Sequence, residues 1–295
     1  MINCYAIEPE AINSFSDLTS TVDLMEYITA RRLFVYPAYK WFSDVYEKCS
    51  DHKNDTMVTE YLNNFLKFSI KSSLDYDEDK EWIINAEQQI QSLNELKAII
   101  NLNKSGKKYV RLSECNSMHP LLNVQHSFNI ARTPSAIVDN FDILLKYANR
   151  IVFVDRFFDI TNACCTNIVD EIKSRVLRYN RQGKLNFAFC ISKEKYNEKI
   201  ILARKQKFFD YYFKKLRSDL TNVIDVYLIE EKYFHNRFVL SEIASWQGGN
   251  GFSDNSNSGG VDNDDFTPMD YGHYQKMVSY LTQDHCSYHF EFKLE

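Results

Sequence analysis

The residues best suited to chemistry lie near position 235, where a histidine and an arginine flank a single asparagine. If Tyr233 to Leu240 forms a β-strand, its side chains alternate, so His235 and Arg237 project from the same face. A neutral imidazole can attack phosphorus, and a guanidinium can hold two phosphate oxygens in a bidentate contact. This pair therefore predicts a site that handles phosphate groups.

A cluster of glycines follows the pair. Five of the eight glycines in the chain fall between Gly248 and Gly260, and glycine allows backbone N–H groups to approach an anion closely. Two plainer explanations stay open: the arginine bonds a carboxylate beside a satisfied histidine, or the glycines form only a strand-to-loop turn. On the functional interpretation, the expected phosphate-binding residues are Gly249, Asn250, Gly251 and Asn255.

The spacing of these residues resembles the site motif of the phospholipase D superfamily, H-x-K-x4-D-x6-G-S-x-N. The chain has His235-x-Arg237, four residues, Glu242, six residues, and then Gly249-Asn250-Gly251-Phe252. The spacing agrees throughout, but Arg stands for Lys, Glu for Asp, Asn for Ser and Phe for the final Asn. The resemblance covers roughly Tyr109 to Glu295.

The resemblance implies a role for each matched residue. His235 would be the nucleophile that forms a phosphohistidine, Arg237 would clamp the non-bridging oxygens, and Glu242 would orient a histidine. Asn250 would complete the phosphate cradle. A second histidine must protonate the leaving group, and the chain has one such motif, so activity would require a homodimer. The expected activity is cleavage of phosphodiesters by a nuclease that uses no metal and no cofactor.

A second branch of the superfamily is similar to the chain in other positions. The phospholipase D-like domains that follow MIT domains have an H-x-R, then a Gly-Trp or Gly-Gly step, and then G-x-G-[LF]-[DS]. The chain follows this shape through Arg237, Trp246, Gly249, Gly251 and Phe252. That likeness implies lost catalysis and binding to membrane surfaces. The alternative function is a non-catalytic module that binds anionic lipid, nucleic acid or protein within a larger assembly. The Asn, Ile, Lys and Tyr bias suggests an AT-rich genome and a bacterial mobile or defence locus.

A basic segment rich in aromatics offers a possible contact surface for nucleic acid. Residues 184–217 contain ten basic and three acidic residues among six aromatics that begin at Tyr196, a composition typical of grooves that follow a phosphate backbone. A helix that buries its aromatics under a solvated lysine face would look the same. The expected contact residues are Lys199, Arg204, Lys205, Lys207, Lys214 and Lys215.

Alternating strands and helices must position these residues. Short apolar runs at 150–155, 184–192 and 223–230 predict strands, helical stretches separate them, and 285–294 alternates as a closing strand. This order predicts an α/β layer with a largely parallel sheet. Asp155 and Asp159 lie at and just beyond the end of the first strand, where sites in α/β proteins gather, although capping is the ordinary role of such residues.

The front of the chain is expected to be a separate helical domain. Ile83, Ala86, Ile90, Leu93 and Ile100 follow steps of three, four and seven, which is typical of one helix face. The polar segment at 101–108 gives a boundary between a helical N-terminal domain, 1–104, and a phospholipase D-like α/β domain, 105–295. Residues 1–104 hold 10 basic and 17 acidic residues, a net charge of −7, which suggests that this domain recruits a protein partner.

Composition limits the class of protein and its location in the cell. With 44% hydrophobic and 25% charged residues, the chain has ordinary globular values, and its net charge of −5 argues against coating nucleic acid by bulk electrostatics. No apolar run reaches the roughly 18 residues of a membrane helix, and no secretory signal is visible. Seven scattered cysteines without a C-x-x-C pair indicate a cytoplasmic location.

Overall fold

The structure is a computed structural model, and it divides the chain into two compact units, Ile2–Gln125 and His126–Glu295. The residues that it describes are 4–13, 33–36, 40–48, 63, 69–71, 76–92, 96–115, 119–122, 127–159, 162–181, 184–192, 223–249, 251–254, 263–269, 271–281 and 286–293.

The first unit is built around a five-stranded sheet in the order β3-β2-β1-β4-β5, in which every neighbouring pair is parallel. Its core lies along β1, where all four residues are buried, and along most of β4. Its elements are β1 (Cys4–Ile7), α1 (Pro9–Asn13), β2 (Leu33–Tyr36), α3 (Lys40–Lys48), β3 (Ser69–Lys71), α5 (Trp82–Ser92), β4 (Leu96–Asn101), β5 (Tyr109–Arg111) and a 3-10 turn (Leu112–Glu114).

This sheet corrects the expectation of an all-helical front portion. Ile83, Ala86 and Ile90 do share the buried face of α5, but Ile100 belongs to β4, and Leu93 lies outside the described residues. Short strands buried on both faces carry continuous apolar residues instead of an alternation, so their period resembles that of a helix. The polar segment at 101–108 includes the connection from β4 to β5, and the boundary between the two units along the chain follows Gln125.

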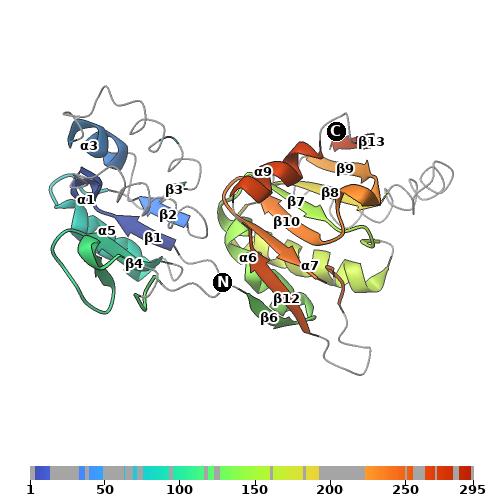
Figure 1. Cartoon of the computed structure of the whole chain (residues 1–295), viewed down its shortest axis with the longest axis horizontal. Helices are drawn as coiled ribbons and strands as arrows, with labels where there is room; N and C mark the ends of the chain where they lie inside the picture. Colours follow the sequence, from blue (N-terminus) through green and yellow to red (C-terminus); the bar gives the residue numbers. More distant parts are fainter. Residues whose placement is uncertain are drawn as a thin grey trace. The chain divides into compact units, whose positions relative to one another are not determined.

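The second unit confirms the α/β class, with an eight-stranded mixed sheet in the order β13-β9-β8-β7-β10-β11-β12-β6 (Figure 1). The pairs β7–β8 and β8–β9 are parallel, and all other neighbours are antiparallel, so the sheet is mixed and the expectation of a largely parallel sheet is wrong. The elements are β6 (Phe128–Ala131), α6 (Pro134–Tyr147), β7 (Arg150–Val154), α7 (Ala163–Arg178), β8 (Asn186–Ser192), β9 (Val223–Ile229), a 3-10 turn (Glu231–Tyr233), β10 (Arg237–Ser241), β11 (Ser245–Gly248), β12 (Asn263–Pro268), α9 (Tyr271–Ser279) and β13 (Cys286–Lys293).

Helices pack on both faces of this sheet. Phe153 of β7 contacts Phe141 of α6, whereas Val152 and Val154, which point the other way, pack in a cluster with Met277 of α9. Alternation along β7 therefore places α6 and α9 on opposite faces.

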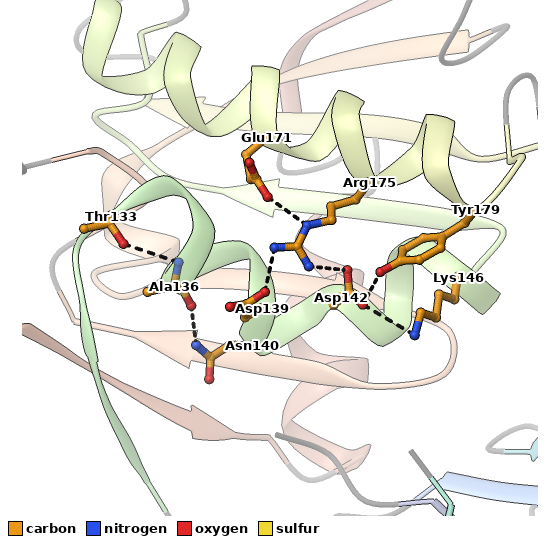
Figure 2. Close-up of polar contacts among 9 residues, drawn as sticks. All are labelled: Thr133, Ala136, Asp139, Asn140, Asp142, Lys146, Glu171, Arg175 and Tyr179. Atoms are coloured by element: carbon orange, nitrogen blue, oxygen red, sulfur yellow. Dashed lines mark hydrogen bonds and ion pairs between the residues drawn. The ribbon is translucent and has the colours of Figure 1, made fainter. Parts of the chain in front are cut away.

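An ionic network joins α6 to its neighbour α7 (Figure 2). Arg175 of α7 donates from Nε to Glu171 (2.7 Å) and from its two Nη atoms to Asp139 (2.7 Å) and Asp142 (3.2 Å) of α6. The Tyr179 hydroxyl also donates to Asp142, at 2.5 Å. These contacts fix the helix pair that covers one face of β7 and β8.

Strand directions bring many loop residues to one edge of the sheet. Because β10 is antiparallel to β7 and each strand beyond it reverses again, β6, β7, β8, β9 and β11 all end at this edge, and β10 and β12 begin there. We call it the carboxyl edge. Sites in α/β proteins occur at such edges.

Candidate anion-binding site

The carboxyl edge collects charged and polar residues from segments that are far apart in the sequence. Each one begins or ends a strand or lies within two residues of a strand end, so the sheet fixes its position. They are Arg132 after β6, Asp155 after β7, Ser192 at the end of β8, Glu231 after β9 and Arg237 at the start of β10.

Asp155 is the buried centre of this group, with 3% of its surface exposed. Its Oδ1 accepts the N–H of Phe157 (2.8 Å) and its Oδ2 that of Phe252 (2.9 Å). Burial raises the pKa of this carboxyl above its ordinary value, although the two backbone hydrogen bonds and the charges of Arg237 and Arg132 oppose the shift. Asp155 therefore ties two loops together and faces two guanidinium groups.

The Arg237 guanidinium is held by backbone carbonyls more than by the carboxylate of Asp155. Its Nη1 donates to the carbonyl of Gly249 (2.6 Å) and to that of His235 (3.4 Å). Its Nε lies 3.8 Å from Asp155 Oδ1, which is an ion pair but is beyond hydrogen-bond distance. The guanidinium is thus fixed in place while its Nε–H has no acceptor among the described residues.

The glycine-rich loop packs against these two side chains. Gly251 has φ +98°, and a Cβ added there would lie 2.5 Å from Asp155 Oδ2 and 3.5 Å from Arg237 Nε. Phe252, where the superfamily motif has asparagine, is fully buried and contacts Phe153 and Phe266 with centroids 5.7 and 5.9 Å apart. The loop is therefore anchored by an aromatic side chain and needs glycine for close approach.

Two backbone N–H groups of this loop donate to carboxylates. Gly249 donates to Asp264 Oδ1 at 3.2 Å, and Phe252 donates to Asp155. Of the residues that we expected to bind phosphate, Gly249 uses its amide within the protein, and Gly251 lies beside Arg237.

Three arginines at this edge have a buried Nε–H without an acceptor among the described residues: Arg132, Arg156 and Arg237. The rest of each guanidinium is anchored, since an Nη of Arg132 donates to Ser253 Oγ and Nη1 of Arg156 lies 3.4 Å from Glu231 Oε2. Glu231 in turn accepts from the Ser192 hydroxyl at 2.8 Å. We call these three residues the arginine cluster. Over the described ranges, the other buried side-chain nitrogens of this kind belong to Trp82, Arg181 and Trp246.

The exposed aromatic ring of Phe157 contacts two members of the arginine cluster, Arg156 and Arg237. Phe157 is 44% exposed, and its ring centroid is 4.7 Å from Arg156 Cζ and 5.0 Å from Arg237 Cζ. These are cation–π distances.

His235 lies at the same edge but not in the strand that we expected. The 3-10 turn Glu231–Tyr233 precedes it, and strand pairing begins at Arg237, opposite Gly248. His235 is therefore an exposed residue in a bend, and its carbonyl, not its imidazole, contacts Arg237.

Glu242 lies at the other end of β10. Its carboxylate accepts the backbone N–H of Asn149 and, at 3.4 Å, that of Arg150, at the start of β7. The structure thus brings His235, Arg237, Gly249 and Gly251 together and separates Glu242 from them.

Several expected site residues fall outside the described residues, so the structure gives no position for them. They are Asn250 and Asn255 of the phosphate-binding set and Lys199, Arg204, Lys205, Lys207, Lys214 and Lys215 of the basic segment.

Sequence reasoning missed Arg132, Arg156 and Phe157, and noted Asp155 only as a residue at a strand end. The available signal was position, because Arg132 follows the apolar run 128–131 and the other three follow the run 150–154. Residues directly after a strand in an α/β sheet are the first place to look for a site.

Among the described residues, no group of three or more His, Cys, Asp or Glu side chains is arranged to hold a metal ion. No described helix is both long enough and apolar enough to cross a membrane.

Fold and site together define an α/β unit with an arginine-rich carboxyl edge. No protein-family model and no curated protein matches the sequence. Among solved structures, the chain is similar to phosphatidylserine synthase from Haemophilus influenzae Rd KW20, with 11% identity and a TM-score of 0.34 over 54% of this chain and 37% of the synthase. It is also similar to TrmBL2, described as an archaeal chromatin protein with a novel mode of DNA binding, with 11% identity and a TM-score of 0.29 over 89% of this chain and 80% of that one. The chain spans little more than a third of the length of the synthase.

Proposed function

We propose that the His126–Glu295 unit binds a phosphate or phosphodiester group at its carboxyl edge. The observation that supports this most is the arginine cluster, in which three buried Nε–H donors lack an acceptor among the described residues. A buried donor without a partner costs about 1 to 3 kcal/mol. A phosphate has several strong acceptor oxygens and would satisfy such donors, as arginine does in many phosphate sites.

The surroundings of the cluster favour a bound ligand over simple internal pairing. The carboxylates beside it are occupied, since both oxygens of Asp155 accept backbone N–H groups and Glu231 accepts from Ser192. The guanidinium groups are anchored through their Nη atoms, so they need little reorganisation when an anion arrives.

Calorimetric titration of the full chain with inorganic phosphate and with bis(4-nitrophenyl) phosphate, in EDTA, tests the proposal. Arg156→Gln and Arg237→Gln should each weaken binding about 10- to 150-fold, the loss expected for a hydrogen bond to a charged group. Arg178→Gln, on the exposed end of α7, is the matched control and should bind like wild type. Equal affinity in all three variants would contradict the proposal.

A second candidate is phosphodiester cleavage with His235 as nucleophile. It is supported by the exposure of His235 at the edge where Arg237 is anchored. One imidazole cannot attack the phosphorus atom and protonate the leaving group in the same step. This function therefore requires a homodimer that brings two copies of His235 to one substrate. Turnover of bis(4-nitrophenyl) phosphate in EDTA by wild type, absent in His235→Ala, would support it. A strict monomer by sedimentation, or turnover that survives His235→Ala, would exclude it.

The proposal extends to the setting of the protein. We place it in the cytoplasm, supported by the scattered cysteines without a C-x-x-C pair, and we assign the acidic residues 1–104 a protein partner.

A further inference from the structure

We infer that the phosphate ligand belongs to a single-stranded nucleic acid and that Phe157 stacks on one of its bases. This inference rests on the anion site proposed above. It adds a second ligand feature, an aromatic base, that phosphate chemistry alone does not require.

The position of Phe157 is fixed from two sides. Its backbone N–H donates to Asp155 Oδ1 at 2.8 Å, the same oxygen that pairs with Arg237 Nε. Its ring then lies within 5.0 Å of the Cζ atoms of Arg156 and Arg237. The carboxylate that organises the arginine cluster therefore also sets the ring beside it.

Two properties of this ring suit a nucleobase. It is 44% exposed although it is a large apolar group, so a planar ligand can reach it. It is also adjacent to the donors that would hold a phosphate, which is the combination found in single-strand binding sites, where bases stack on aromatic rings while basic groups follow the backbone.

A membrane surface fits the same edge less well. Membrane binding requires an apolar face of several side chains, and over the described ranges the other exposed large apolar residues are Ile84, in the first unit, and Leu177, near the end of α7. Because α7 begins beside the carboxyl edge and runs away from it, Leu177 cannot join Phe157 in one apolar face.

The test measures binding of the full chain to a fluorescein-labelled 15-nucleotide oligothymidine and to an abasic oligomer with the same backbone. Phe157→Leu should weaken oligothymidine binding about 5- to 150-fold, the range expected for one stacked base, and should leave abasic binding unchanged. Phe157→Trp should retain the affinity, and the new indole should be quenched by oligothymidine. Leu177→Ala is the control for loss of an exposed apolar side chain.

The salt dependence separates this inference from the proposed function. Phe157→Leu should leave the slope of log affinity against log salt unchanged, whereas Arg156→Gln should reduce it by about one. Equal losses on both oligomers, or none, would overturn the base-stacking inference while the arginine effect stands. Failure of both oligomers to bind while inorganic phosphate still binds would overturn the nucleic-acid inference and leave the phosphate site in place. Direct binding to phosphatidylserine vesicles in that case would replace nucleic acid by lipid.

Discussion

Replacing Gly251 by alanine should loosen the carboxyl edge through a single methyl group. The added Cβ would lie 2.5 Å from Asp155 Oδ2 and 3.3 Å from Asp155 Cγ, where ordinary contacts begin at 3.4 Å. The carboxylate must therefore move, and with it the atoms that Asp155 holds.

The expected cost follows from what Asp155 would lose. Its Oδ2 accepts the N–H of Phe252 and its Oδ1 that of Phe157, so a shift large enough to relieve the contact removes at least one hydrogen bond to a charged acceptor. That loss costs about 1.5 to 3 kcal/mol. The positive φ of Gly251 adds about 1 to 2 kcal/mol for any L-residue. We expect the free energy of unfolding of the second unit to fall by about 2.5 to 5 kcal/mol.

Native-state hydrogen exchange measures the free energy of unfolding of each unit separately. Amides of β7 and β10 should lose protection by the expected amount, whereas those of β1 and β4, in the other unit, should not change. Gly106→Ala is the matched control, because the nearest atom to its added Cβ is 3.7 Å away.

Removing the Asp155 carboxylate should remove most of the stability loss caused by Gly251→Ala. In an Asp155→Ala background, Gly251→Ala should cost only the backbone part, about 1 to 2 kcal/mol. A loss below about 0.5 kcal/mol in the wild-type background, or the same loss with and without the carboxylate, would refute the close packing of Gly251 on Asp155.

Three further predictions concern ionisable groups of the two units. Because burial raises the folded pKa of Asp155, its protonated form stabilises the unit at low pH, so the stability of wild type relative to Asp155→Asn should fall as the pH rises from about 4 through the raised pKa; urea midpoints that diverge the other way would contradict this. Arg175→Ala should cost about 1.5 to 3 kcal/mol in urea unfolding because Asp142 loses its charged donor, and Arg178→Ala about 0.5 kcal/mol or less; equal costs would count against the network. Burial and Glu87 raise the pKa of Tyr109 to about 12, so the first unit should lose stability from about pH 10 towards that value, and Tyr109→Phe should flatten this loss in urea unfolding followed by circular dichroism.

The strands of the second sheet could be predicted from the sequence, whereas those of the first sheet could not. The difference lies in the length and pattern of their apolar runs. The apolar runs at 150–155, 184–192 and 223–230 are bounded by polar turns and became β7, β8 and β9, and the alternating tail became β13. The strands of the first unit are three to six residues long, and β1 is buried throughout. Without an alternating pattern, such runs are not distinguishable from helix stripes by period alone.

The site was predicted in part. The spacing around His235 and Arg237 located the carboxyl edge, but the same spacing suggested that Glu242 belonged to it. Residues 237–241 form a strand, and at about 3.3 Å per residue the five steps to Glu242 cover about 16 Å, which carries it to the opposite edge. Arg132 and Arg156 reach the site from other strands, so only the three-dimensional strand order could reveal them.

The most direct test of the central claim is the NMR spectrum of arginine Nε–H groups in a labelled full-length chain titrated with inorganic phosphate. We expect the Nε–H signals of Arg132, Arg156 and Arg237 to shift together and to saturate at one dissociation constant. Arg181, whose buried Nε–H also has no acceptor among the described residues but whose Nη donates to the Ala148 carbonyl at the other end of α6, should not respond. Shifts that fail to appear in the cluster, or that appear equally at Arg181, would contradict the phosphate site.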